Sequence, residues 1–186
     1  MPSKEDEAVL LRAARQGDPE AFGKLYEDYA PQVFRYLYAN LDERMEAEDL
    51  TGEVFLRVWQ ALPGYREKGF PFRAFLFRVA RNALIDRSRR LRQRRSHQPL
   101  DEERMAEHVS NPGGQQEQAL EHEELYRLLG RLREDYHTVL ALRFLAGLSP
   151  EEIAQAMGKS NSAVRVLQHR ALAALRKILA NSGNFP

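Results

Sequence analysis

The chain has 186 residues and a mass of 21.5 kDa, with 43% hydrophobic residues, 30% charged residues, no cysteine and a formal net charge of +1. This length suits one ordinary domain or two small ones, and the apolar content is too high for a wholly disordered chain. The lack of cysteine excludes disulfides and thiolate catalysis, and no apolar run reaches the roughly 18 residues of a membrane span, so we expect a soluble, cytoplasmic protein without membrane insertion.

Hydrophobic periodicity predicts helices almost throughout the chain and no convincing strand, so the expected fold class is all-α. A short helix ends at Gly17. Asp18-Pro19 then places an N-cap residue before a proline at the first helical position, which is a firm helix start. A further helix covers about 47–62 and ends at a Pro-Gly pair. Residues 1–60 carry a net charge of −6, which leaves an acidic surface for basic protein partners.

Residues 61–95 carry a net charge of +9 and contain a helix predicted from Phe72 to about Arg90. Arginines alternate with aromatic residues along this segment. One side of the helix can neutralise phosphates, and exposed aromatic rings such as Phe70 or Phe72 can stack on unpaired bases. The alternatives are a solvated helix end for the arginines and core positions for Phe75 and Phe77. The polar side of the helix consists of Arg78, Arg81, Asn82, Ile85 and Arg89.

The hydrophobic pattern disappears over residues 96–120, where Pro99, Pro112 and the pair Gly113-Gly114 interrupt an acidic, polar stretch. We interpret this stretch as a flexible acidic linker. It divides the chain into a first small helical domain, residues 1–95, and a second, residues 121–186. Because few apolar residues could join the halves, we expect the two domains to be independent.

A dense set of helix signals lies in the second domain. Ser149-Pro150-Glu151-Glu152 is a capping box with proline at the first helical position, and the helix that it starts ends at Gly158. A longer helix follows. This order, a short helix, a tight glycine turn and a longer helix, is typical of the DNA-binding helix-turn-helix, whose second helix enters the major groove.

Projection of the last helix at about 100° per residue separates a packing face from an exposed face. On the exposed face, Arg165 can bond guanine, Ser162 can bond either type of base, and Val166 can touch a thymine methyl group. The competing interpretation is that this face is merely solvated. The exposed face contains Ser162, Arg165, Val166 and His169, and Arg170 and Arg176 lie nearer the flanks, where phosphates are expected.

Nothing in the sequence indicates catalysis. The five histidines show no metal-ligand spacing, and neither a Gly-rich phosphate loop nor a Gly-x-Ser-x-Gly motif is present. We therefore predict that the chain is not an enzyme and has no catalytic residue, metal or cofactor.

Three motifs in order give the chain a resemblance to a known family. The segments AEDLTGEVFLRVWQAL (47–62), FRAFLFRVARNALIDRSRR (72–90) and LSPEEIAQAMGKSNSAVRVLQHRALAALR (148–176) resemble the corresponding helices of bacterial RNA polymerase sigma factors, in particular the minimal extracytoplasmic-function group. Two positions depart from the family pattern. Gly52 stands where the family usually has glutamine or another helix former, and Val166 with Leu167 stands where it often has Ser and Arg.

The resemblance implies a sigma factor that binds core RNA polymerase, directs it to specific promoters and helps to open the minus-ten region. It also implies promoter DNA and an anti-sigma factor as partners. By this resemblance, core-polymerase binding falls to Asp49, Leu50, Glu53, Phe55 and Trp59, minus-ten DNA binding to Phe70, Phe72, Arg78, Arg81, Asn82 and Arg89, and minus-thirty-five DNA binding to Ser162, Arg165, Val166, His169, Arg170 and Arg176.

Two other functions remain open at this point. A helix-turn-helix repressor or activator that is not a polymerase subunit explains the C-terminal half equally well, but it leaves the arginine-rich helix and the acidic helix unexplained. A helical adaptor that binds no DNA requires both basic segments to be accidental.

Overall fold

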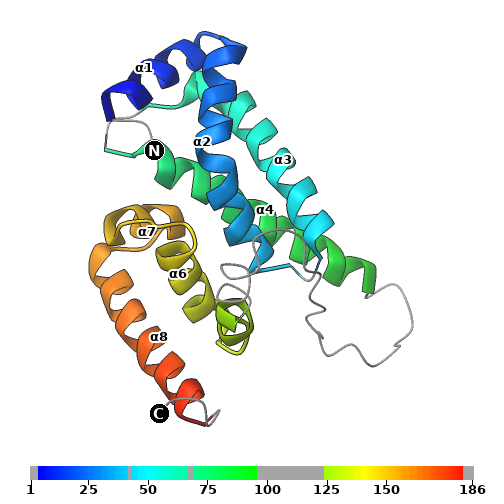
Figure 1. Cartoon of the computed structure of the whole chain (residues 1–186), viewed down its shortest axis with the longest axis vertical. Coiled ribbons are helices and arrows are strands. Elements are labelled where there is room, and N and C mark those ends of the chain that lie inside the picture. Colours follow the sequence, from blue (N-terminus) through cyan, green and yellow to red (C-terminus); the bar gives the residue numbers. More distant parts are fainter. Residues whose placement is uncertain (1–3, 42, 67–68, 96–123, 182–186) are drawn as a thin grey trace.

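A computed structural model describes residues 4–41, 43–66, 69–95 and 124–181, so the predicted linker lies outside the described residues. These residues are helical and contain no strand, which confirms the all-α class (Figure 1). The helices are α1 (Lys4–Arg15), α2 (Pro19–Tyr38), α3 (Arg44–Ala61), the 3-10 helix η1 (Leu62–Gly64), α4 (Phe72–Arg95), a helix over 124–130, α6 (Glu134–Phe144), α7 (Pro150–Met157) and α8 (Asn161–Asn181).

Helix α2 is the central helix of the N-terminal domain. The Asp18 carboxylate accepts hydrogen bonds from the backbone N–H groups of Glu20 and Ala21, so the predicted N-cap is confirmed. The Tyr29 hydroxyl donates to the Glu7 carboxylate, which ties α1 to α2. The Tyr36 ring lies edge-on to Phe77 of α4 with 5.7 Å between ring centroids. These contacts fix α4 against α2.

The capping box predicted at the start of the helix-turn-helix is present in the C-terminal domain. The Ser149 hydroxyl accepts from the backbone N–H of Glu152 at 3.1 Å, and the Glu152 carboxylate accepts from the backbone N–H of Ser149 at 2.8 Å. Helix α7 ends at Gly158, whose φ of +64° lies in the left-handed region that favours glycine. Helix α8 then packs against α6 and α7, with Val164 and Ala171 buried.

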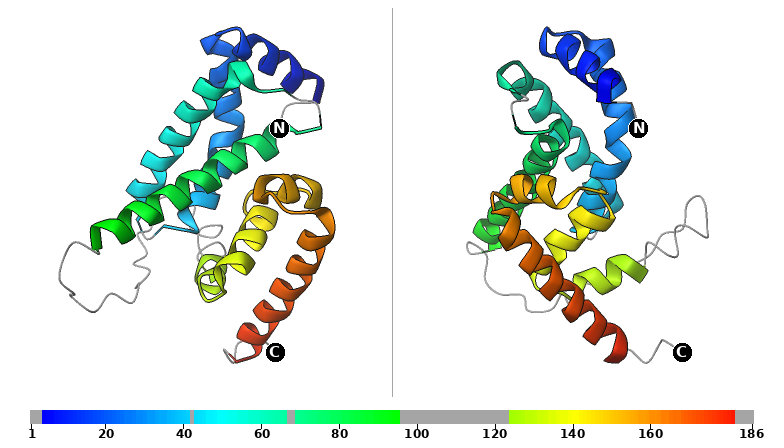
Figure 2. Two further views of the ribbon diagram at one scale, coloured as in Figure 1. Left: turned by 180° about the vertical axis from the view of Figure 1, so that it is seen from behind. Right: turned by 90° about the vertical axis from the view of Figure 1, so that its left-hand side faces the viewer.

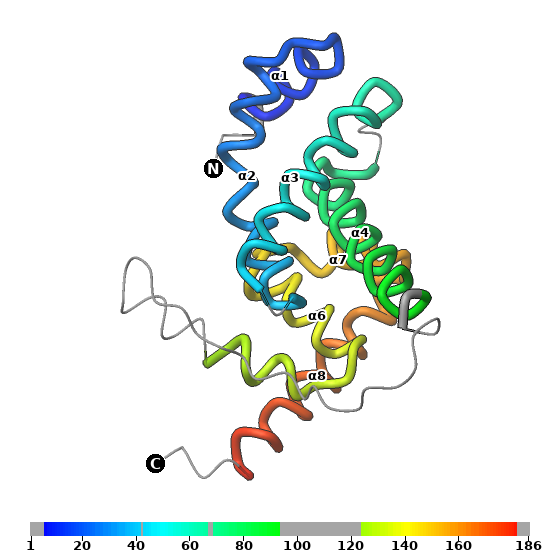
Figure 3. The backbone as a smooth tube through the Cα atoms, turned by 90° about the vertical axis from the view of Figure 1, so that its right-hand side faces the viewer, coloured from blue at the N-terminus to red at the C-terminus, as the bar shows by residue number. Residues whose placement is uncertain are grey.

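The two domains pack against each other, which contradicts our expectation that they are independent. The Arg73 guanidinium of α4 donates to the carbonyls of Ala146 and Gly147 at 2.8 and 3.0 Å, and the Gln155 amide of α7 donates to the carbonyl of Gly69 at 2.7 Å. Figures 2 and 3 show the short helix α7 lying beside α4. Because these bonds use backbone carbonyls in turns, hydrophobic periodicity gave no signal for them.

A second contact between the domains lies near the C-terminal end of α2. The Tyr38 ring meets the Tyr126 ring edge-on, with 5.2 Å between centroids. Burial raises the pKa of the Tyr126 hydroxyl to about 12. Arg35 also donates from α2 to the carbonyl of Leu145 at 3.3 Å. We call the contacts of Arg35, Arg73 and Gln155 the interdomain latch.

Candidate nucleic-acid interfaces

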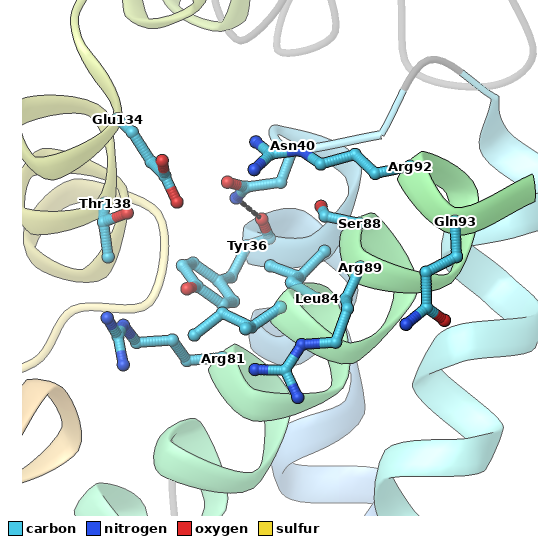
Figure 4. A pocket seen from close by; sticks show the side chains of 11 residues that line it. Tyr36, Asn40, Arg81, Leu84, Ser88, Arg89, Arg92, Gln93, Glu134 and Thr138 are labelled. Carbon is cyan, nitrogen blue, oxygen red and sulfur yellow. Dashed lines mark hydrogen bonds between the residues drawn. The ribbon is translucent and has the colours of Figure 1, made fainter. Parts of the chain in front are cut away.

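The polar side of α4 faces a cavity between the two domains. This cavity has a volume of about 570 Å³ and is lined by residues of α2, α4 and α6. Figure 4 shows Arg81 and Arg89 of α4 on one side, and Glu134 and Thr138 of α6 on another. The structure therefore brings these two predicted minus-ten arginines together, but it places the C-terminal domain opposite them.

The arginines of α4 divide into two groups. Arg87 pairs with the Glu46 carboxylate, which joins α4 to α3. By contrast, Arg81, Arg89 and Arg92 form no ion pair within the described part of the chain, and all three line the cavity. These three cations outnumber the one carboxylate of the lining, that of Glu134, so an anion such as a phosphate would be stabilised there.

The two aromatic residues that were predicted to stack on bases behave differently. Phe70 is half-buried, and the Arg78 guanidinium lies 5.8 Å from its ring centroid. Phe72 is only 1% exposed and packs edge-on against Tyr29 at 5.5 Å, so it is a core residue and its assignment as a base-stacking residue is wrong. The helical spacing of Phe72 with Leu76, Val79 and Ala83 also predicts a core position for this ring, so the sequence allowed both interpretations, and the contacts with α2 decide for the core.

Asn82 lies on the other flank of this surface. Its side chain is exposed beside a hollow of about 300 Å³ that Arg57 and Asp86 also line. Arg57 donates to Asp86 at 3.0 Å and to Glu53 at 2.6 Å, and hydrogen bonding, first to Asp86, raises the pKa of Arg57. A hydrogen-bonded chain therefore connects α3 to the segment of α4 that carries Asn82.

The predicted reading face of α8 is exposed. Ser162, Arg165, Val166 and His169 all lie on the solvent side, whereas Val164 is buried, so the orientation predicted from the helical projection is confirmed. One guanidinium nitrogen of Arg165 lies 3.8 Å from the Glu151 carboxylate, and both side chains are more than half exposed. Arg170 and Arg176 are exposed as well. Contact of these side chains with bases or phosphates stays a prediction.

The acidic helix α3 presents a narrower exposed surface than predicted. Asp49 is exposed and Glu53 partly so, but Leu50 and Phe55 are buried, so these two belong to the core and their assignment to an exposed docking surface is wrong. Trp59 is half-buried, with 4.7 Å between its ring centroid and that of Phe22.

Two exposed apolar residues were missed on α3. Met45 is 72% exposed and Leu56 is 56% exposed. They lie four residues before and seven residues after Asp49, a spacing that places them on the same side of the helix. This spacing could have identified both residues from the sequence as part of the same surface as Asp49. We call Met45, Asp49, Glu53 and Leu56 the α3 patch.

Within the residues that the structure describes, no group of three potential metal ligands among His, Cys, Asp and Glu is found. No helix in that part of the chain is long and apolar enough to cross a membrane.

Family models match both domains. The model described as Sigma-70 region 2 matches residues 25–95, and the model described as Sigma-70, region 4 matches residues 122–175. The first match contains α3 and α4, and the second contains the helix-turn-helix.

Relatives that match over most of the chain are also RNA polymerase sigma factors. The chain is 35% identical to the ECF RNA polymerase sigma factor ShbA of Streptomyces griseus over 91% of this chain and 93% of the relative, and 36% identical to SigD of Mycobacterium tuberculosis over 96% and 86%. It is 34% identical to BldN of Streptomyces coelicolor over 91% of this chain but spans only 64% of that relative. In the solved structure of CnrH with the cytosolic domain of CnrY, CnrH is similar at 25% identity and a TM-score of 0.72, over 95% of this chain and 98% of that chain.

Proposed function

The chain belongs to the extracytoplasmic-function (ECF) sigma factors of RNA polymerase, and we propose that it directs the core enzyme to specific promoters and helps to open their minus-ten region. The observation that carries this proposal is the pairing of two basic surfaces in one chain: the unpaired arginines of α4 and the exposed reading face of α8. A helix-turn-helix regulator that is not a polymerase subunit does not account for the region 2 match over residues 25–95.

We assign the minus-ten function to the polar side of α4. Arg81 and Arg89 supply positive charge for the phosphates of the melted strand. Phe70 supplies a partly exposed ring for an unpaired base, and the nearby Arg78 guanidinium can bind the adjoining backbone. Asn82 adds an exposed amide on the same side of the helix. Phe72 supports this surface from the core.

We assign core-polymerase docking to the α3 patch. Its two carboxylates, Asp49 and Glu53, suit a basic surface on the polymerase, and its two exposed apolar residues can be buried on binding. Glu53 is also tied through Arg57 to Asp86 of α4. Docking of polymerase at Glu53 would therefore act, through Arg57, on the hydrogen bond that joins α3 to Asp86 of α4.

The closed arrangement of the domains implies an opening step. In the latched state α7 contacts Gly69, next to Phe70, and α6 lies opposite Arg81 and Arg89. Melted DNA and the C-terminal domain cannot both occupy this surface. Core polymerase and promoter DNA would therefore bind an opened state, whereas an anti-sigma factor, a partner that we also propose, would favour a closed one.

The chain is a regulatory subunit rather than an independent catalyst in this proposal, and it has no enzymatic activity of its own. The chemistry of RNA synthesis belongs to the polymerase. We place the protein in the cytoplasm, where polymerase and promoters are found.

Run-off transcription with purified core polymerase tests the proposal. We expect promoter-dependent initiation with the full chain and no other specificity subunit. The double substitution Asp49→Lys and Glu53→Lys should weaken binding to core polymerase, whereas reversal of the exposed Glu27 of α2 should not. Absence of initiation with core enzyme, together with DNA binding by the free chain, would instead support the regulator that acts outside polymerase.

A further inference from the structure

A groove of about 450 Å³ lies beside the reading face of α8, between this helix and the N-terminal end of α6. Three of its lining side chains are exposed cations, namely Arg133, Lys159 and Arg170. Val166 lines the groove and also belongs to the reading face, so the two surfaces are continuous. Neither Arg133 nor Lys159 was among the residues predicted to bind DNA.

Arg133 is held in place by an aromatic ring. Its guanidinium carbon lies 4.2 Å from the ring centroid of Tyr136, one turn along α6. One guanidinium nitrogen is 3.6 Å from the Asp135 carboxylate, but these side chains are 62% and 47% exposed, and ion pairs at such exposure are weak. A guanidinium carries five N–H donors, so a stacked Arg133 still has donors free for a ligand.

The other two cations have no ion-pair partner in the described ranges. Lys159 follows Gly158 in the turn that precedes α8, and Arg170 lies further along α8. The apolar part of the lining comes from Tyr136, Val166 and Leu167. Positive charge that is distributed along a groove with one apolar side matches a nucleic-acid strand, which has phosphates on its outside and bases and sugars on its inside.

We propose that Arg133, Lys159 and Arg170 bind phosphates of the DNA strand that borders the major groove entered by α8, and that Tyr136 positions Arg133 for this contact. The proposal rests on the proposed function, because it takes α8 as the helix that reads the minus-thirty-five region. It extends the upstream DNA contact from one helix to two. The added contacts are with phosphate, so they increase affinity without reading sequence.

The salt dependence of binding tests this assignment. Fluorescence anisotropy would measure binding of the full chain to a 30-bp duplex with the minus-thirty-five region of a promoter used in run-off transcription, and to an unrelated 30-bp duplex. Arg133→Ala should weaken binding to both duplexes by the same factor and reduce the slope of log K against log salt by about 0.9, the value for one phosphate contact. Tyr136→Leu should give part of this loss, and Tyr136→Phe should restore wild-type binding.

Arg127→Ala is the matched control, because Arg127 is an exposed arginine of the same domain that does not line the groove. It should leave the slope unchanged. The proposal is wrong if Arg133→Ala and Lys159→Ala, both folded by circular dichroism, keep the wild-type slope, as expected if the groove instead holds an acidic protein segment. It is also wrong if Arg133→Ala changes sequence preference. Either result leaves the sigma function intact, whereas failure of run-off initiation by the wild type overturns that function itself.

Discussion

The two helices that we propose to bind nucleic acid differ in how much of their polar side is exposed to solvent. Helix α8 exposes Ser162, Arg165, Val166 and His169 to solvent, and only its opposite side is packed. Helix α4 is packed by α2, α3 and α7, and three of its arginines, Arg81, Arg89 and Arg92, face a cavity that α6 helps to line. In our proposal the upstream DNA contact is therefore preformed in the free chain, whereas the minus-ten contact requires movement of the C-terminal domain.

This difference shows that a helix can carry all the basic residues of a DNA-binding face while another domain covers that face. Charge alternation along the sequence indicates which surfaces bind polyanions. Whether DNA can reach such a surface depends on contacts between the domains, such as the hydrogen bonds of Arg73 with two turn carbonyls and of Gln155 with Gly69. The predictions below test the contrast between α4 and α8, starting with the largest expected effect.

The pair Phe70 and Phe72 separates binding from stability at the start of α4. Phe72→Ala should reduce the free energy of unfolding by about 3–5 kcal/mol, because it removes a fully buried ring. Phe70→Ala should change stability by about 1 kcal/mol or less. It should instead weaken binding of the holoenzyme to single-stranded minus-ten DNA by about 1–3 kcal/mol. Thermal melts measure the stability, and titration of the holoenzyme with labelled single-stranded minus-ten DNA measures the binding.

Equal losses of stability in both variants would show that Phe70 is a core residue as well. In that case the aromatic contribution to the minus-ten surface would have to come from another part of the chain.

The latch prediction tests whether the closed arrangement limits α4. Arg73→Ala with Gln155→Ala should favour the open state by about 2 kcal/mol, which is roughly thirty-fold, because it removes the two hydrogen bonds of the Arg73 guanidinium and the hydrogen bond of the Gln155 amide. The chain has no native cysteine, so spin labels at Gln60→Cys and Ala180→Cys can report the distance between domains. We expect longer distances and tighter binding of single-stranded minus-ten DNA by the free chain, with unchanged binding of upstream duplex.

Arg143→Ala is the control for the latch. Arg143 donates to the carbonyl of Leu148 at 3.0 Å and so contacts the same turn from within its own domain. It should leave the label distance unchanged. If the double latch variant has the distance distribution of the wild type, the contacts of Arg73 and Gln155 do not hold the domains closed.

The features that could be predicted from sequence are those whose cause is local. The helix starts at Asp18 and Ser149, the left-handed end at Gly158 and the exposed face of α8 follow from spacings of a few residues. The burial of Phe72 and the interdomain bonds of Arg73 depend on residues that are distant in sequence. Periodicity on one helix cannot identify the partner that covers its other side.

Within α8, we expect Arg165 to contact a base and Arg176 to contact a phosphate. Arg165→Ala should cost about 1–3 kcal/mol on the correct upstream sequence and relax preference at one promoter position, because Arg165 is at the exposed centre of the reading face. Arg176→Ala should weaken all sequences similarly and reduce the salt slope by about one. Binding across promoter variants and salt concentrations measures both. An equal loss for every sequence with Arg165→Ala would make Arg165 a phosphate contact.

The smallest expected effect is at Gly52 of α3, which faces neither DNA surface. A Cβ atom at Gly52 would meet no other atom within 4 Å, and its backbone is helical. Gly52→Ala should therefore increase the free energy of unfolding by about 0.5–1 kcal/mol through reduced backbone freedom in the unfolded chain. Gly17→Ala, at a φ of +91°, should be destabilising instead.

Because Gly52 lies beside the α3 patch, binding to core polymerase should be measured with the same variant. A stabilised Gly52→Ala that binds core polymerase less well would show that polymerase approaches the α3 backbone closely at this position, whereas unchanged binding of both DNA regions is expected in either case.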